Sequence, residues 1–317
     1  MRFVLVGGIG FVGINLAEEL ADHGEVVVVG RPSSARRRPR ITAALRGLGA
    51  DVVLLDRIDS SSLASLGGDV YYHVAGVLVG PPSAFWDAHV NLLREVVSAA
   101  SQTGSRVVYV SSTAAMGEAL GRPPGSTLTE EESHLDPREF SQGTVYEVTK
   151  AEGERLLVRS SEALGGRWSI VRPSLVFGPW GYEVQWPLVY HLARRGIAPF
   201  FGSRNLIYSR DLARILWDAG RGLYDGRWVI ASWPQDVDMG DVAVEICRQL
   251  KVACRLRVDV GWLLRRLPTL EFMGLSMIVR MLRFNYKYVS RVVNVQFSTL
   301  ERAVEDFLSW ASTGMSA

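Results

Sequence analysis

Short apolar runs alternate with longer stretches along the first half of the chain. The runs are nearly continuous in hydrophobicity, and they are Phe3–Val6, Val26–Val29, Val52–Leu55, Val70–His73, Val107–Val110 and Trp168–Val171. Continuous apolar runs are typical of strands in a sheet that is covered on both faces. The stretches at 11–22, 40–48, 84–103 and 145–164 have the length of helices. This alternation predicts an α/β fold of Rossmann type, with a doubly wound parallel sheet.

Beyond about residue 175 the alternation loosens, and Pro, Gly and Trp are scattered among shorter elements. We therefore expect a dinucleotide-binding Rossmann domain over 1–175 and a smaller, mixed C-terminal substrate-binding region over 176–317. Some C-terminal segments are expected to return to the Rossmann core. No linker marks a clean boundary.

Composition narrows the class of protein. A chain of 317 residues that is 48% hydrophobic is too long and too apolar to be a disordered tail. Its 35 basic and 33 acidic residues nearly cancel, so we expect no nucleic-acid partner. The two cysteines, Cys247 and Cys254, exclude a disulfide framework and predict no metal site. The apolar start is too short for a signal peptide and no run is long enough to span a bilayer, so we expect a cytoplasmic protein.

Glycines fill the turn after the first expected strand. Gly7, Gly8, Gly10 and Gly13 precede a helical stretch, and a strand–turn–helix is the context in which such glycines hold a dinucleotide. They permit a tight turn and close approach to a pyrophosphate, which then faces the helix N-terminus. The expected cofactor-binding residues of this turn are Gly7, Gly10, Phe11, Val12 and Gly13.

The segment after the second strand bears on the choice of cofactor. NAD-specific sites usually place an acid there, whereas this chain has Gly30-Arg31-Pro32-Ser33-Ser34-Ala35-Arg36-Arg37-Arg38. A guanidinium at Arg31 would pair with a 2′-phosphate. We therefore expect NADP in preference to NAD, and we interpret Arg36–Arg38 mainly as a solvated basic loop.

Tyr146 and Lys150 stand four residues apart on an expected helix, so their side chains share one face. A free tyrosine has a pKa of about 10, and a nearby cation lowers it toward the range of a general acid–base. Lys150 is one of only three lysines among the 35 basic residues. Upstream, the strand ending at Val110 is followed by Ser111, Ser112 and Thr113, where a hydroxyl could hold a substrate oxygen.

Together these features resemble the extended short-chain dehydrogenase/reductase family. The likeness runs in order over most of residues 1–215, through the glycine turn, Asp56-Arg57, His73-Val74-Ala75-Gly76, Asn91, Ser112, Tyr146, Lys150, Arg172–Pro179 and Tyr208–Ala213. The resemblance implies that Tyr146, Lys150 and Ser112 are catalytic, with Thr113 as the alternative hydroxyl. It further implies cofactor contacts from Asp56, Arg57, Ala75, Gly76, Lys150 and Pro173.

Two positions disagree about the branch of the family. Sugar-nucleotide enzymes usually carry Asn where this chain has Leu175, and the segment 111–117 is closer to dihydroflavonol-reductase-like and 3β-hydroxysteroid-dehydrogenase-like members. Arg204 stands where sugar-nucleotide enzymes contact a diphosphate. Leu175 and Arg204 are therefore both candidate substrate-binding residues. We give Leu175 more weight, which favours the reductase branch over the sugar-nucleotide enzymes.

The stretch 262–284 is strongly apolar but contains four arginines. It could cover an apolar substrate pocket, dock a partner subunit, lie on a membrane surface, or form an ordinary core helix.

We expect hydride transfer between NADP(H) and a carbonyl or hydroxyl carbon of a small-molecule substrate. One alternative is a nucleotide-sugar epimerase or dehydratase, and a second is a non-catalytic dinucleotide-binding subunit or redox sensor. The resemblance also suggests a homodimer through the helices at 84–103 and 145–164.

Overall fold

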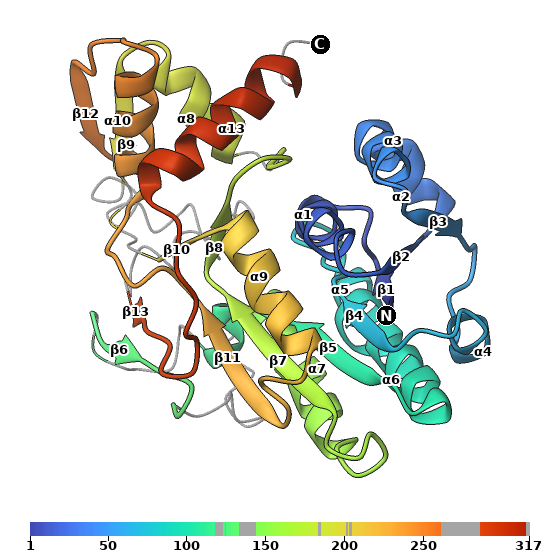
Figure 1. Cartoon of the computed structure of the whole chain (residues 1–317). Coiled ribbons are helices and arrows are strands. Elements are labelled where there is room, and N and C mark those ends of the chain that lie inside the picture. Colours follow the sequence, from blue (N-terminus) through green and yellow to red (C-terminus); the bar gives the residue numbers. More distant parts are fainter. Residues whose placement is uncertain are drawn as a thin grey trace.

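A computed structural model describes residues 1–117, 123, 125–132, 144–182, 185–200, 202, 205–260 and 286–314. In these ranges the central sheet is formed by β1 (Arg2–Val6), β2 (Glu25–Gly30), β3 (Asp51–Leu54), β4 (Val70–His73), β5 (Arg106–Val110), β7 (Trp168–Pro173) and β11 (Arg227–Ala231). All seven are parallel, in the order β11-β7-β5-β4-β1-β2-β3 (Figure 1). The predicted doubly wound α/β fold is confirmed.

Helices cover both faces of this sheet (Figure 1). They are α1 (Phe11–Leu20), α2 (Pro32–Arg37), α3 (Pro39–Gly47), α4 (Ser60–Ala64), α5 (Pro82–Trp86), α6 (Leu92–Thr103), α7 (Val145–Arg159) and α9 (Ser209–Gly220). The predicted helix at 84–103 is divided by a π-helical turn, Asp87–Asn91, between α5 and α6. The expected basic loop contains α2, which begins at Pro32, and proline is preorganised for a first helical position.

The buried side chains of β1 divide between two hydrophobic layers. Phe3 and Leu5 pack in the layer that includes α1, α3 and α9, whereas Val4 and Val6 pack in the layer of α4, α6 and α7. Side chains of a strand alternate between faces, and here both faces are apolar because both are covered. This explains why the sequence shows continuous runs.

Strand order reverses between β1 and β4, which are neighbours in the sheet. In open α/β sheets, ligands bind beyond the carboxyl ends of the strands at such a reversal. The glycine turn follows β1, and the segment with Ala75 and Gly76 follows β4. The fold therefore directs both candidate cofactor segments to this crevice.

Among the described residues, the C-terminal region contributes further helices and forms short strand pairs, one of them with a segment earlier in the chain. They are α8 (Gln185–Ala193), α10 (Met239–Gln249) and α13 (Leu300–Gly314), with the parallel pairs β8 (Leu175–Phe177) and β10 (Leu206–Tyr208), β9 (Ile197–Phe200) and β12 (Leu256–Asp259), and β6 (Thr127–Leu128) and β13 (Lys287–Tyr288). In the described ranges, no helix has both the length and the apolar character needed to cross a membrane.

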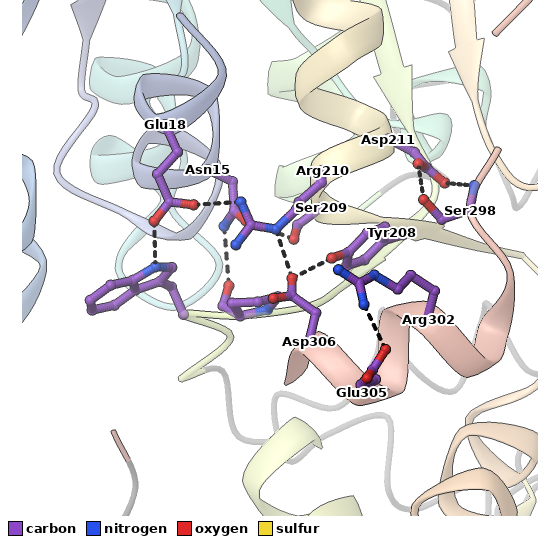
Figure 2. Close-up of polar contacts among 12 residues, drawn as sticks. Asn15, Glu18, Tyr208, Ser209, Arg210, Asp211, Ser298, Arg302, Glu305 and Asp306 are labelled. Carbon is purple, nitrogen blue, oxygen red and sulfur yellow. Dashed lines mark hydrogen bonds and ion pairs between the residues drawn. The ribbon is translucent and has the colours of Figure 1, made fainter. Parts of the chain in front are cut away.

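Polar side chains fasten this C-terminal region to α1 (Figure 2). Ser209 of α9 donates a hydrogen bond to Asn15 of α1 at 2.8 Å. Arg210 forms ion pairs with Glu18 of α1 at 2.9 Å and with Asp306 of α13 at 2.7 Å. The helix that follows the glycine turn is thus connected directly to the elements on the C-terminal side.

Candidate functional site

The glycine turn is tightly packed at Gly7 and Gly13 and open at Gly10. Gly7 has φ +79°, and a Cβ there would lie 2.4 Å from the Cβ of Ala75. A Cβ on Gly13 would lie 2.0 Å from the carbonyl oxygen of Gly8, whereas one on Gly10 would meet nothing within 4 Å. Gly7 and Gly13 therefore permit the tight packing of the turn, and Gly10 leaves space beside it.

That space lies at the N-terminus of α1, which begins with Phe11, Val12 and Gly13 and has no side-chain cap. Backbone amides at a helix N-terminus bind anions, and the helix dipole adds to the attraction. The residues present thus fit the diphosphate of a dinucleotide.

Two arginines stand near the end of β2. Arg31 is exposed and immediately precedes α2, and no acidic residue occurs between Gly30 and Arg38. Arg38 donates a hydrogen bond to the carbonyl oxygen of Ile9, in the glycine turn, at 3.1 Å. Arg38 is exposed, as expected of a solvated basic loop, and its guanidinium also contacts the glycine turn where α2 ends.

The other expected contacts on the cofactor side follow neighbouring strands. Asp56 and Arg57 come after β3 and are exposed, and Arg57 lies 3.6 Å from Asp59. Ala75 and Gly76 come after β4, where the side chain of Ala75 lies against the backbone of Gly7. Their location beyond the carboxyl ends of the strands is compatible with a cofactor in the crevice.

Lys150 lies in the interior of α7, with only 3% of its surface exposed. Its Nζ donates a hydrogen bond to the carbonyl oxygen of Val110 at 2.8 Å and lies 5.1 Å from the ring centre of Tyr109. Burial lowers the pKa of Lys150 to about 7, and Glu154 offsets part of that effect. The lysine is thus fixed to the carboxyl end of β5.

A buried ion pair between Glu154 and Arg172 stabilises the position of α7. Glu154, one turn after Lys150 on α7, accepts hydrogen bonds from Arg172 Nε at 2.9 Å and from Ser111 Oγ at 2.5 Å. Arg172, on β7, is completely buried. Removing one partner would leave a buried charge uncompensated, so the pair fixes α7 relative to β5 and β7.

Ser112 and Thr113 differ in accessibility. Ser112 is half-buried and caps a 3₁₀ turn, Thr113–Met116, by accepting a hydrogen bond from the amide of Ala114 at 3.2 Å. Thr113 is buried. This turn packs on α7 through Ala115 and Ala151. The elements that carry Ser112, Tyr146 and Lys150 are therefore in contact at one end of the sheet.

Tyr146 is half-buried in the first turn of α7, and its ring lies edge-on to that of His89, with 5.5 Å between ring centres. Asn91, which was part of the family resemblance, has an exposed side chain that donates to Asp87 at 2.8 Å. The π-helical turn therefore directs His89 toward α7, and no feature of the sequence distinguished this histidine.

The remaining candidate residues are Pro173 on the cofactor side and Leu175 and Arg204 on the substrate side. Pro173 is buried at the end of β7, and Leu175 is half-buried at the start of β8. Arg204 and the stretch 262–284 lie outside the described residues.

Comparison with known proteins adds to this geometry. The model of the NAD dependent epimerase/dehydratase family matches residues 3–227. The chain belongs to this family. Its members use a nicotinamide dinucleotide, which agrees with the glycine turn and the uncapped α1 described above.

A curated relative from Synechocystis, described as a "Putative dihydroflavonol 4-reductase", is 29% identical over 231 residues. The match covers 69% of this chain but only 64% of that protein's length.

Two solved structures share the fold. A UDP-galactose 4-epimerase is 24% identical with a TM-score of 0.68, and the match covers 98% of this chain and 99% of that one. A UDP-glucuronic acid 4-epimerase from Bacillus cereus, solved in complex with NAD, is 15% identical with a TM-score of 0.70 and 99% coverage of both chains. At these identities the likeness shows the fold alone.

Proposed function

We propose that the chain is an NADP(H)-dependent oxidoreductase that interconverts a carbonyl and a hydroxyl group on a small, apolar molecule. The observation that carries this proposal is the pair on α7. Tyr146 is half-buried in the first turn, and Lys150 is buried one turn later and bonded to Val110 at the carboxyl end of β5. A tyrosine needs such a cation nearby to exchange a proton close to neutral pH.

Each residue of the pair has a distinct role in the proposal. Tyr146 Oη donates a proton to the substrate oxygen during reduction and takes it back during oxidation. Lys150 in its protonated form stabilises the phenolate electrostatically, and it binds the cofactor ribose. Ser112 donates a hydrogen bond to the same substrate oxygen, and its half-buried position favours it over the buried Thr113.

The dinucleotide supplies or accepts the hydride when it is bound. Its diphosphate would lie at Gly10 and the N-terminus of α1, through Phe11, Val12 and Gly13. Asp56, Arg57, Ala75 and Gly76 would bind the adenosine side, and Pro173 would line the nicotinamide side.

NADP is proposed over NAD because the segment from Gly30 to Arg38, which follows β2, contains arginines and no acidic residue. Arg31 precedes α2, and Arg38 is held beside the glycine turn by its bond to Ile9. Guanidinium groups bind phosphate through charge-assisted hydrogen bonds. Phosphate recognition by Arg31 together with Arg38 would distinguish NADP(H) from NAD(H).

An apolar substrate is proposed because of Leu175, which lies half-buried directly beyond the end of β7. A leucine there has no side-chain amide with which to bind a nucleotide sugar. A cytoplasmic homodimer through α6 and α7 also belongs to this proposal, and sedimentation equilibrium would test its oligomeric state.

The deciding experiment follows the oxidation state of added cofactor. The purified protein is mixed with NADPH and a panel of aldehydes and ketones, and in parallel with oxidised cofactor and UDP-sugars. We expect stoichiometric loss of NADPH as a carbonyl compound is reduced. Conversion of a UDP-sugar without net cofactor oxidation would instead establish the epimerase, and cofactor binding without turnover in either arm would indicate the non-catalytic alternative.

A further inference from the structure

His89 occupies an unusual position at the junction of three segments. It lies in the π-helical turn Asp87–Asn91, and π-helical turns are often found at functional sites. Its side chain is completely buried. Nε2 accepts a hydrogen bond from the backbone amide of Val77 at 3.2 Å, and Nδ1 lies 2.8 Å from Thr149 Oγ1 on α7.

These contacts define which nitrogen carries the proton. Because Nε2 accepts from an amide, it presents a lone pair, and the proton of the neutral ring is on Nδ1. Nδ1 therefore donates to Thr149 Oγ1, which itself donates to the carbonyl oxygen of Val145 at 2.7 Å. The result is a continuous chain of hydrogen bonds from the segment after β4 to the first turn of α7.

The surroundings keep this ring neutral. Burial lowers the pKa of His89 far below its usual value, and the charge of the nearby Lys150 on α7 lowers it further. Burial likewise lowers the pKa of His73, to about 3. A neutral imidazole can keep its acceptor and its donor at the same time, whereas a protonated one would have two donors facing the amide of Val77 and Thr149.

His89 also contacts the proposed acid–base directly. Its ring lies edge-on to Tyr146, with 5.5 Å between centres and an interplanar angle of 85°, and edge-on to Phe85 at 5.9 Å. The helix is close on this side, because a Cβ on Gly153 would lie only 2.8 Å from the carbonyl oxygen of His89. The tyrosine ring is thus held against a group that is itself fixed at both nitrogens.

We propose that His89 is a positioning residue that fixes Tyr146 relative to the cofactor segment after β4. The proposal rests on the proposed function, since it assigns His89 a task in that reaction. One nitrogen holds Val77, two residues after Ala75 and one after Gly76, and the other holds the first turn of α7. Cofactor and acid–base are thereby aligned through one side chain.

The two contacts can be separated by substitution. His89→Asn keeps an amide nitrogen near the position of Nδ1, so it retains a donor to Thr149 but loses the bond to Val77. His89→Gln reaches the position of Nε2, so it retains an acceptor for Val77 but loses the bond to Thr149. Thr149→Val removes the hydroxyl partner alone, so it should reproduce the effect of His89→Gln from the other side of the same hydrogen bond.

The proposal predicts opposite kinetic effects for these variants, measured with NADPH and the best substrate of the carbonyl panel. His89→Gln and Thr149→Val lower kcat about tenfold with little change in KM for NADPH, whereas His89→Asn raises KM for NADPH about tenfold with kcat nearly retained. The double variant His89→Gln/Thr149→Val falls no further than either single variant. The proposal is overturned if all three single variants show the same fall in kcat and the same rise in KM for NADPH. It is also overturned if the losses of kcat in the double variant are additive.

A second measurement does not require turnover. Histidine ¹⁵N resonances of the intact protein are recorded from about pH 5 to 8, the range in which an ordinary histidine titrates, and His89→Gln identifies the resonance. We expect a neutral Nδ1–H tautomer throughout, and a ring that protonates or carries its proton on Nε2 refutes the proposed alignment. Absence of any carbonyl reduction would contradict the proposed function while this measurement still decides the role of His89.

Discussion

The burial of Lys150 predicts a specific dependence of stability on pH. In the folded chain, burial lowers the pKa of Lys150 from 10.5 to about 7. In the unfolded chain the same amine remains protonated up to about pH 10.4. Unfolding above pH 7 therefore takes up a proton, and the free energy of unfolding rises with pH across this window. Below pH 7 both states are protonated and the penalty for burying the charge is constant.

Lys150→Met removes this titration while keeping an unbranched side chain. Each pH unit over which the folded amine is neutral and the unfolded amine charged is worth about 1.4 kcal/mol. Between pH 6 and 9, the stability of the wild type relative to the variant should therefore increase by about 2 to 3 kcal/mol. The lost bond to Val110 and the altered packing add an offset that does not depend on pH.

The assay is urea unfolding of both proteins at several pH values without added cofactor. Lys251 is exposed, so Lys251→Met serves as the control and should differ from the wild type by a constant amount. A Lys150→Met difference that is equally flat between pH 6 and 9 would refute the argument, because it would mean that burial does not depress the pKa of Lys150.

Two further substitutions test the supports of the site. Glu154→Gln leaves the buried Arg172 without its counter-charge. The free energy of unfolding at neutral pH, measured in urea, should therefore fall by about 3 to 5 kcal/mol. A fall below about 1 kcal/mol, which is typical of an exposed ion pair, would contradict the assigned role. Arg38→Ala should weaken NADPH binding about tenfold or more while changing NADH binding little, as measured by calorimetric titration. Arg37→Ala is the control at the neighbouring arginine, which is likewise exposed. Equal effects on the two cofactors would exclude Arg38 from 2′-phosphate recognition.

The local chemistry of the sequence predicted the fold well. The run Phe3–Val6 and the glycines that follow it determine a strand and a helix start through contacts within a few residues of the chain. Accordingly β1 and α1 form where expected. The pattern did not identify β11 (Arg227–Ala231) as a strand of the main sheet. That strand pairs with β7, about sixty residues earlier, so its place depends on tertiary packing.

The site was predictable to the extent that its residues lie at fixed spacing. Tyr146 and Lys150 share a helix face, which spacing alone indicates. Arg38 could not be distinguished from its neighbours, because its contact with Ile9 arises from the way α2 ends. His89 had no distinguishing pattern either, since its partners lie in two segments that are distant in sequence, Val77 after β4 and Tyr146 and Thr149 on α7.

The central claim is that Tyr146 transfers the proton in an NADPH-dependent reduction. The most direct test is Tyr146→Phe, which removes one hydroxyl and leaves the ring that packs on His89. Turnover of the best carbonyl substrate should fall at least about 100-fold, as expected for loss of a general acid, while the Kd for NADPH stays within about twofold. Turnover at the wild-type rate would contradict the account.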